Sequence, residues 1–196
     1  MIGVYEVLPA GLAAQVAALE AAAWPGAGPG HDPALAPRTV VLREGAADAG
    51  GAGDAGGAGA VVACLTLLHK EIRMAGVTYR AAGLSSVVTR ADARGRGLGS
   101  RLVTAAREAL AADPGVDLAL FSCDRELTPF YEAAGFERLP GTVLLGGTPA
   151  DPLPSDRAGF DKSVLGAFFT PDPAATRALF TAARVPLYPG PIDRLW

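Results

Sequence analysis

A glycine-rich turn between an apolar strand and an amphipathic helix, in residues 87–101 (VVTRADARGRGLGSR), constrains this chain more than any other segment. Three alternating glycines, Gly95, Gly97 and Gly99, lie directly before the helical pattern. The first-turn N–H groups of a helix have no partners within it and lie at the positive end of its dipole. Glycine lets the backbone approach an anion closely, and two arginines in the turn add positive charge. The segment therefore predicts a cradle for a pyrophosphate group.

The spacing of these glycines excludes the two common nucleotide-binding motifs. A dinucleotide fingerprint needs G-x-G-x-x-G and a later acidic residue, whereas this turn reads G-x-G-x-G and no acidic residue follows at the expected place. A Walker A loop needs Gly-Lys-Ser/Thr, and the stretch has no lysine. The pattern that fits is R-x-x-G-x-G, formed by Arg94, Gly97 and Gly99.

A second block, Phe130-Tyr131-Glu132-Ala133-Ala134-Gly135-Phe136, follows about 30 residues later in a short helical segment. In order, spacing and strand–helix context, the two blocks match the R/Q-x-x-G-x-G/A and F-Y-x-x-x-G-F signatures of one superfamily. Over residues 84–139 the chain resembles the GNAT superfamily of acyl-CoA-dependent N-acyltransferases. That resemblance implies acetyl-CoA as the co-substrate, no metal, and direct attack of a neutral amine on the thioester.

The resemblance also implies a role for each matching residue. The strand residues Val87, Val88 and Thr89 are expected to offer backbone groups to the acetyl carbonyl and the pantetheine amides. The pyrophosphate is expected to be wrapped, chiefly by main-chain N–H groups, by the turn residues Arg94, Gly95, Arg96, Gly97, Leu98, Gly99 and Ser100. Tyr131 is expected near the CoA sulfur as the general acid, since a phenol can protonate or hydrogen-bond a leaving thiolate. Its alternative role is that of a core aromatic which packs beside CoA.

Residues 70–145 and the C-terminal sequence Ile192-Asp193-Arg194-Leu195-Trp196 more weakly resemble the aminoglycoside 2′-N-acetyltransferases. That likeness implies that Asp193 and the Trp196 carboxylate face a cationic substrate. The chain departs from this family where a glutamate precedes the pyrophosphate loop, because it has Ser85-Ser86 there. This departure leaves the general base open. Further candidate residues for the substrate side are Ser85, Ser122 and Asp124.

Composition and charge exclude several classes of binding partner. A net charge of −3 and a pI near 5.4 argue against nucleic acid, and no apolar run is long enough for a membrane span. Two cysteines and two histidines are too few for a disulfide framework or a multi-histidine metal centre.

The N-terminus lacks a signal-peptide pattern, so a cytoplasmic protein is expected. The Ala, Gly and Arg bias is typical of a GC-rich, bacterial-type genome. Cys123 has no histidine near it in sequence and is not expected to be a nucleophile, and His69 is expected at the surface, at a strand end.

Apolar periodicity gives the element order. Strands are predicted at residues 2–8, 39–43, 60–68, 77–89, 117–122, 136–139, 142–145 and 163–169, and helices at 11–23, 98–112, 129–134 and 173–183. Thr128 is predicted as an N-cap and Gly135 as the C′ residue of the third helix. The fold expected is α/β (α+β), a GNAT-like mixed and mainly antiparallel sheet of about seven strands with helices on both faces. CoA is expected where the strand ending at Thr89 parts from the strand ending near Ser122.

A single domain over residues 1–196 is expected. Residues 45–60 contain only Gly, Ala and Asp, which favours a flexible loop between neighbouring strands over an interdomain linker. Residues 146–196 are expected to complete the substrate side or a homodimer interface. The function expected is acetyl transfer to a primary amine of a small molecule, such as an aminoglycoside-like polyamine. The alternatives are another small amine, a peptide N-terminus, or a non-catalytic acyl-CoA sensor. Acyl-CoA hydrolysis has no dedicated nucleophile or metal set to support it.

Overall fold

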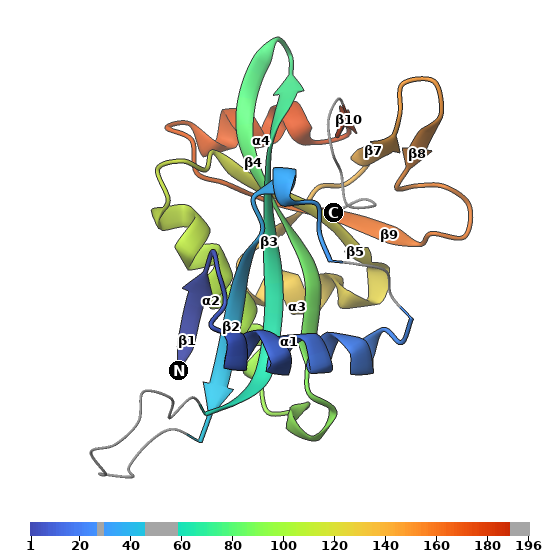
Figure 1. The fold of residues 1–196 in the computed structure, drawn as a ribbon. Helices are drawn as coiled ribbons and strands as arrows, with labels where there is room; N and C mark the ends of the chain where they lie inside the picture. The colour runs from blue at the N-terminus through green and yellow to red at the C-terminus, as the bar shows by residue number, and fades with distance from the viewer. Residues whose placement is uncertain (27–29, 46–58, 189–196) are drawn as a thin grey trace.

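The fold is built on a seven-stranded sheet with the strand order β1-β2-β3-β4-β5-β9-β6, and a second, three-stranded sheet has the order β10-β7-β8 (Figure 1). The computed structural model describes residues 1–26, 30–45 and 59–188. The strands of the large sheet are β1 (Ile2–Tyr5), β2 (Arg38–Glu44), β3 (Ala60–Met74), β4 (Val77–Thr89), β5 (Leu118–Asp124), β6 (Glu137–Arg138) and β9 (Lys162–Phe168). The α-helices are α1 (Ala10–Ala23), α2 (Leu98–Ala112), α3 (Thr128–Ala133) and α4 (Pro173–Phe180).

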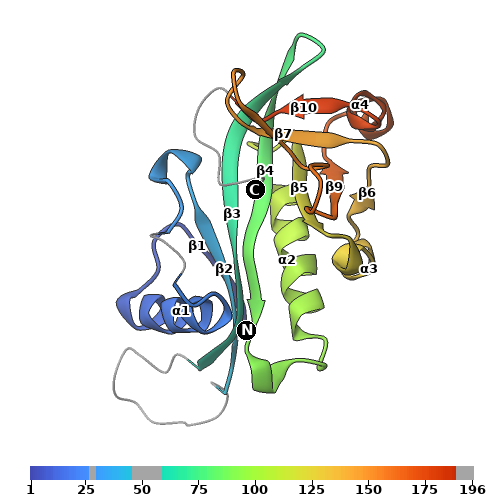
Figure 2. The ribbon, with the colours of Figure 1, turned by 90° about the vertical axis from the view of Figure 1, so that its right-hand side faces the viewer.

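The large sheet is antiparallel except where β4 meets β5. These two strands are parallel and pair at only two positions, Ala81 with Leu118 and Ala82 with Ala119. Beyond them β4 continues to Thr89 with β3 alone as its described partner, while β5 continues along β9. The strands therefore splay apart at their carboxyl ends, as Figure 2 shows between β4 and β5. The predicted fold class and the predicted splay are both confirmed.

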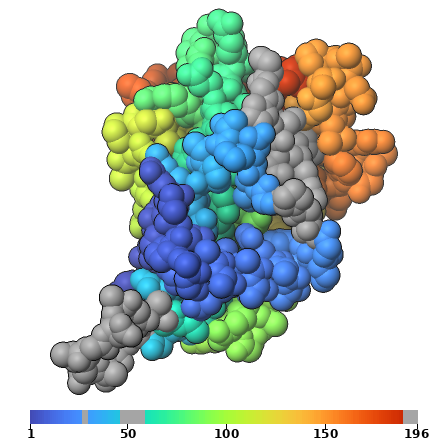
Figure 3. All heavy atoms as spheres, in the orientation of Figure 1, coloured from blue at the N-terminus to red at the C-terminus, as the bar shows by residue number. Residues whose placement is uncertain are grey.

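Helices cover both faces of the sheet, with α1 on one face and α2 and α3 on the other (Figure 2). The apolar stripe of α1, formed by Leu12, Val16 and Leu19, is buried against β2, β3 and β4. In the space-filling view α1 crosses the sheet as a continuous band (Figure 3). On α2 the buried residues are Leu98, Leu102, Val103, Ala106 and Leu110, a spacing of one helical face.

The second sheet contains β7 (Val143–Gly147), β8 (Pro152–Pro154) and β10 (Arg184–Pro186). Its core merges with that of β9 and α4 around Phe180, which is fully buried and meets the Tyr79 ring edge-on at 5.4 Å. The strand expected at 142–145 thus exists but belongs to this separate sheet, because β9 pairs with β6 on that side. Sequence periodicity has no signal for which sheet a short strand joins.

Most predicted element ends agree with the structure, since they depend on strong local signals. Trp24-Pro25 ends α1, Asp113-Pro114 ends α2, and Gly135 follows α3 with a φ of +88°. Thr128 is not the N-cap: it is the first residue of α3, and Leu127 occupies the cap without a side-chain hydrogen bond.

The prediction that His69 lies at a strand end is also wrong. β3 runs on to Met74, and His69 is half-buried within it, with Nδ1 3.1 Å from the Ala36 carbonyl oxygen. Most of the predicted loop at 45–60, residues 46–58, lies outside the described residues. The strands that flank it, β2 and β3, are antiparallel neighbours.

Candidate functional site

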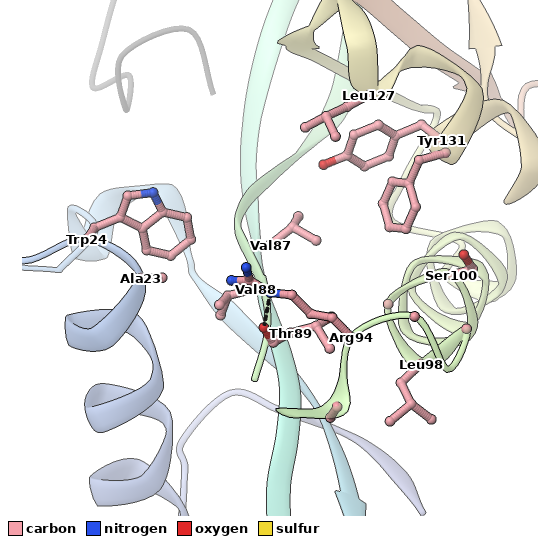
Figure 4. A pocket seen from close by; sticks show the side chains of 15 residues that line it. Ala23, Trp24, Val87, Val88, Thr89, Arg94, Leu98, Ser100, Leu127 and Tyr131 are labelled. Atoms are coloured by element: carbon pink, nitrogen blue, oxygen red, sulfur yellow. Dashed lines mark hydrogen bonds between the residues drawn. The ribbon is translucent and has the colours of Figure 1, made fainter. Parts of the chain in front are cut away.

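The splay opens a pocket of about 540 Å³ at the carboxyl end of β4 and the N-terminus of α2. Three parts of the chain that the sequence pattern singled out meet in it: the end of β4, the glycine-rich turn and α3 (Figure 4). The lining residues are Ala23, Trp24, Val87, Val88, Thr89, Ala93, Arg94, Gly95, Gly97, Leu98, Gly99, Ser100, Leu127, Phe130 and Tyr131. The fold thus brings together ten of the eleven residues expected to contact CoA or its thioester, all except Arg96.

The turn before α2 has the backbone shape of an anion cradle. Gly95 and Gly97 have φ angles of +74° and +72°, in the left-handed region that L-residues avoid. Gly97 is the N-cap of α2, and no side chain caps the helix there. The first-turn amide groups therefore point into the pocket region without an internal side-chain acceptor, at the positive end of a helix of 15 residues. This arrangement suits a phosphate group.

Gly99 serves a different purpose from the other two glycines, namely close packing. A Cβ placed on Gly99 would lie 3.0 Å from Thr89 Oγ1 and 3.4 Å from a ring carbon of Phe130. At Gly95 and Gly97 a Cβ would meet nothing within 4 Å. Gly99 therefore lets α2 approach both β4 and α3, and the other two keep the space in front of the cradle open.

The two arginines of the turn lie differently. Arg94 lines the pocket and is anchored by a hydrogen bond of 3.1 Å from Nε to the Thr89 carbonyl oxygen (Figure 4). Arg96 does not line the pocket and instead pairs with Glu44 at the end of β2, with 2.9 Å between the side-chain nitrogen and oxygen. The positive charge next to the cradle is thus that of Arg94.

Tyr131 is a core aromatic that also lines the pocket. Its ring is 6% exposed and packs edge-on against Phe121 at 4.9 Å and Phe130 at 4.9 Å, so it is part of the core. Its hydroxyl is directed into the pocket towards the side on which Val87 lies (Figure 4). Burial raises the pKa of Tyr131 well above its usual range, helped by the nearby Cys123 and Asp124. The phenol therefore keeps its proton and presents it to the pocket as a hydrogen-bond donor.

A β-bulge interrupts β4 beside the pocket. Register shifts between Cys64 and Thr66 of β3, so that Ser86 and Val87 of β4 stand opposite a single residue. Ser86 has a φ of +50°, unusual for a non-glycine residue inside a strand. The bulge breaks the hydrogen-bond ladder next to Val87, which lines the pocket.

The residues expected on the substrate side do not gather in the pocket. Ser122 and Asp124 lie on β5 opposite Val164 and Lys162 of β9, and the Asp124 carboxylate accepts a hydrogen bond of 2.7 Å from Lys162 Nζ. Ser85 pairs with Thr66 on the β3 side. None of the three lines the pocket. Asp193 and Trp196 lie outside the described residues.

Two exposed apolar side chains at the pocket were not found by sequence reasoning. Trp24, at the end of α1, is 42% exposed, and Leu127, before α3, is 41% exposed. Figure 4 shows Trp24 across the pocket from Tyr131. Trp24 directly follows the helix predicted at 11–23, and no local motif marks a helix end as part of a pocket.

Both cysteines are buried core residues. Burial raises the pKa of Cys64 to about 12 and that of Cys123 to about 11. Both thiols are free and buried, and a buried thiol with a raised pKa is a weak nucleophile. In the described part of the chain, no three His, Cys, Asp or Glu residues lie close enough to hold a metal. Nor is any helix within residues 1–26, 30–45 and 59–188 both long and apolar enough to cross a membrane.

Two solved structures superpose on this fold at low sequence identity. Escherichia coli ElaA superposes with a TM-score of 0.54 at 14% identity, over 85% of this chain and 98% of its own. An acyl-CoA N-acyltransferase from Pseudomonas aeruginosa superposes with a TM-score of 0.53 at 15% identity, over 85% of this chain and 99% of its own. At such identities the likeness establishes the fold.

The family is established by sequence. The family model described as an acetyltransferase (GNAT) domain matches residues 35–139, more than half of the chain. The match spans β2 to the loop after β6 and contains the cradle, the β4 bulge and Tyr131. The chain therefore belongs to the GNAT acetyltransferase family, whose members transfer acyl groups from acyl-CoA to amines. Among curated protein sequences, none matches this chain.

Proposed function

We propose that the protein is an N-acetyltransferase that binds acetyl-CoA in the pocket between β4 and α3 and transfers its acetyl group to a primary amine. The observation that carries this proposal is the left-handed backbone at Gly95 and Gly97, which leads the uncapped N-terminus of α2 into a pocket that Tyr131 also lines. An anion cradle alone fits many phosphates. The same pocket also contains a strand interrupted by a bulge and a buried phenol, which suit an elongated ligand with a thioester at one end.

The residues present fit acetyl-CoA along the length of the pocket. The amides at the start of α2, with Arg94 beside them, bind the pyrophosphate. The exposed edge of β4 at Val87 to Thr89 binds the amides of the pantetheine arm, since β5 has parted from it there. The open space in front of Gly95 and Gly97, where nothing lies within 4 Å of a built Cβ, leaves room for the phosphates.

Tyr131 acts at the thiol end. Thioester cleavage leaves negative charge on sulfur, and a donor fixed beforehand in a water-poor site stabilises that charge. Because burial raises the pKa of Tyr131, its phenol serves first as a hydrogen-bond donor and gives up its proton only as charge develops on sulfur. The surrounding rings of Phe121, Phe130 and Phe136 fix the orientation of the phenol.

The reaction balances without a metal or a covalent enzyme intermediate. The amine nitrogen forms a bond to the acetyl carbon, and the carbon–sulfur bond breaks. The sulfur takes the proton that Tyr131 supplies, and the nitrogen loses a proton that restores the phenol. The buried, highly protonated thiols of Cys64 and Cys123 are unsuited to a covalent step, which favours direct transfer.

The acceptor is a primary amine of a small molecule, and an aminoglycoside-like polyamine is the first to test because of the likeness at residues 70–145. Other small amines and peptide N-termini form the rest of the panel. We place the acceptor at the Trp24 and Leu127 end of the pocket, where exposed apolar side chains flank Tyr131.

The test combines binding with turnover. The purified protein is titrated calorimetrically with CoA and with pantetheine, which lacks the pyrophosphate, and thiol release from acetyl-CoA is followed with each amine of the panel. We expect CoA to bind much more tightly than pantetheine, since each hydrogen bond to a charged group contributes about 1.5–3 kcal/mol. At least one amine should raise thiol release above the amine-free rate, with the acetylated amine seen by mass spectrometry.

The binding and turnover measurements distinguish the alternative functions. If CoA binds tightly and no amine raises thiol release, the protein is a non-catalytic acyl-CoA-binding module and the catalytic proposal is wrong. If pantetheine binds as well as CoA, the pyrophosphate assignment of the cradle is wrong. Thiol release that is equally fast without any amine indicates hydrolysis of the thioester.

A further inference from the structure

Three elements far apart in the sequence meet on the α1 side of the β4 bulge. Ser86 stands at the bulge, and its Oγ lies 3.3 Å from Nε2 of His31. His31 lies in the connection between α1 and the 3-10 helix η1 (Pro33–Leu35) and is half-buried. Glu20, on α1, interacts electrostatically with His31. This set adjoins the pocket, because Ser86 directly precedes Val87, and Ala23 and Trp24 lie one turn beyond Glu20 on the same helix.

The backbone at Ser86 is held in a costly conformation. A non-glycine residue in the left-handed region is strained and persists only where its surroundings enforce it. A bulge commonly redirects a side chain next to a site. Here the bulge directs the Ser86 hydroxyl towards the imidazole of His31, which lies in the connection that follows α1.

The chemistry proposed above needs a proton acceptor at this place. A primary alkyl amine is an ammonium ion at neutral pH, with a pKa near 10.4, and in that form it has no lone pair for attack. Serine hydroxyls relay protons but do not retain them. Imidazole is the side chain that ordinarily gains and loses a proton near neutral pH.

We infer that Ser86 and His31 form the proton acceptor for the substrate ammonium, with Glu20 as a positioning residue; this inference rests on the proposed acetyl transfer. The ammonium N–H bond breaks and its proton passes to Ser86 Oγ. The hydroxyl proton of Ser86 passes at the same time to Nε2 of neutral His31. The products are a neutral amine, an unchanged serine and an imidazolium ion, whose charge Glu20 stabilises.

The charged and titratable groups around His31 are consistent with this role. Glu20 faces it from α1, and burial raises the pKa of that carboxyl while His31 lowers it. Cys64 of β3 lies near Glu20 and remains a thiol, since its pKa is raised to about 12. Asp32, next along the chain, uses its carboxylate to accept a hydrogen bond from the Ala34 amide. Among these groups in the described residues, Glu20 is the carboxyl whose charge interacts with the His31 imidazole.

The test uses the full chain, acetyl-CoA, and the most active amine of the panel. His31→Gln retains a polar group near Ser86 but cannot take up the proton. We expect kcat/KM at pH 7 to fall by about 10²–10⁴-fold, the range for general-base catalysis, while CoA affinity stays within about twofold. The deficit should shrink as the pH rises towards the pKa of the amine, because more of the substrate is then already neutral. His69→Gln is the matched control and should behave as wild type, because His69 lies on β3 with Nδ1 3.1 Å from the Ala36 carbonyl oxygen and not beside Ser86.

A second variant excludes a purely structural role. His31→Ala should regain activity when imidazole is added, in proportion to its neutral fraction, and the control variant should show no such response. Normal kcat/KM in His31→Gln overturns the inference while leaving acetyl transfer intact. A loss that neither high pH nor imidazole restores also overturns it, since His31 then only holds the loop. Wild-type protein that binds CoA and acetylates no amine refutes the proposed function itself.

Discussion

Substituting Gly97 by alanine tests the cradle directly, because the structure separates backbone strain from steric obstruction there. Gly97 has a φ of +72°, and a Cβ would meet nothing within 4 Å. In the protein without CoA, any effect of Gly97→Ala on stability therefore comes from the left-handed backbone. That conformation costs an L-residue about 1–2 kcal/mol. In a chain of this size, about 1 kcal/mol changes Tm by roughly 2–4 °C, so we expect Tm to fall by roughly 2–8 °C.

The variant should lose CoA affinity as well as stability. If the backbone relieves its strain by leaving the left-handed region, the first amides of α2 turn away from the phosphates. Loss of one hydrogen bond to a charged group costs about 1.5–3 kcal/mol, which is a rise in Kd of roughly 10- to 150-fold. Calorimetric titration with CoA measures this change, and thermal unfolding measures the first. Gly97→Asn should lower Tm less than Gly97→Ala does, since asparagine tolerates the left-handed region.

Gly159 supplies the matched control. It has a φ of +88°, open space around a built Cβ, and a position outside the pocket between β8 and β9. Gly159→Ala should lower Tm by a similar amount and leave the Kd for CoA unchanged. Equal weakening of CoA binding by both variants would show that global destabilisation is responsible. Unchanged CoA affinity in a destabilised Gly97→Ala would refute the assignment of the α2 amides to the pyrophosphate.

Two further predictions concern the pocket and the core. Tyr131→Phe should lower kcat of amine acetylation by about 10²-fold or more, within the usual range for a proton donor. CoA affinity should stay nearly unchanged, because the ring contacts with Phe121 and Phe130 remain. Unchanged kcat in steady-state assays would show that Tyr131 is only a packing residue. Cys64 and Cys123 should resist alkylation in the native protein at pH 8, since their pKa values are raised to about 12 and about 11, and labelling should quicken about tenfold per pH unit below those values. Mass spectrometry of iodoacetamide-treated protein checks this, and rapid labelling of either thiol at pH 8 contradicts their burial.

That the residues proposed to hold the cofactor meet in one pocket was predictable, because they are contiguous in sequence. Strand, glycine turn and helix lie within residues 87–101, and the chain itself fixes their spacing. The structural role of each individual glycine was harder to predict from the sequence. Gly99 reads as a third cradle glycine, yet it permits contact with Thr89 and Phe130. Arg96 reads as a phosphate ligand, yet it pairs with Glu44, which is 52 residues away in sequence. Such pairings depend on how β2 lies against the turn, and sequence spacing carries no information on that.

The proposed acceptor half was not predictable, and the reason lies in how the fold assembles it. Glu20, His31 and Ser86 belong to a helix, a connection and a strand bulge, and no motif links them. Serine at a φ of +50° gives no warning in the sequence, whereas glycine at the same angle does. The bulge itself arises from a register shift between β3 and β4, a tertiary property of two long strands. In this proposal the cofactor cradle lies on one continuous segment, whereas the acceptor groups lie on a shifted strand and a separate helix. The cradle can therefore stay unchanged while the acceptor groups vary. The identity of the amine therefore has to be sought around Trp24, His31 and Ser86, and not in the motif that identifies the family.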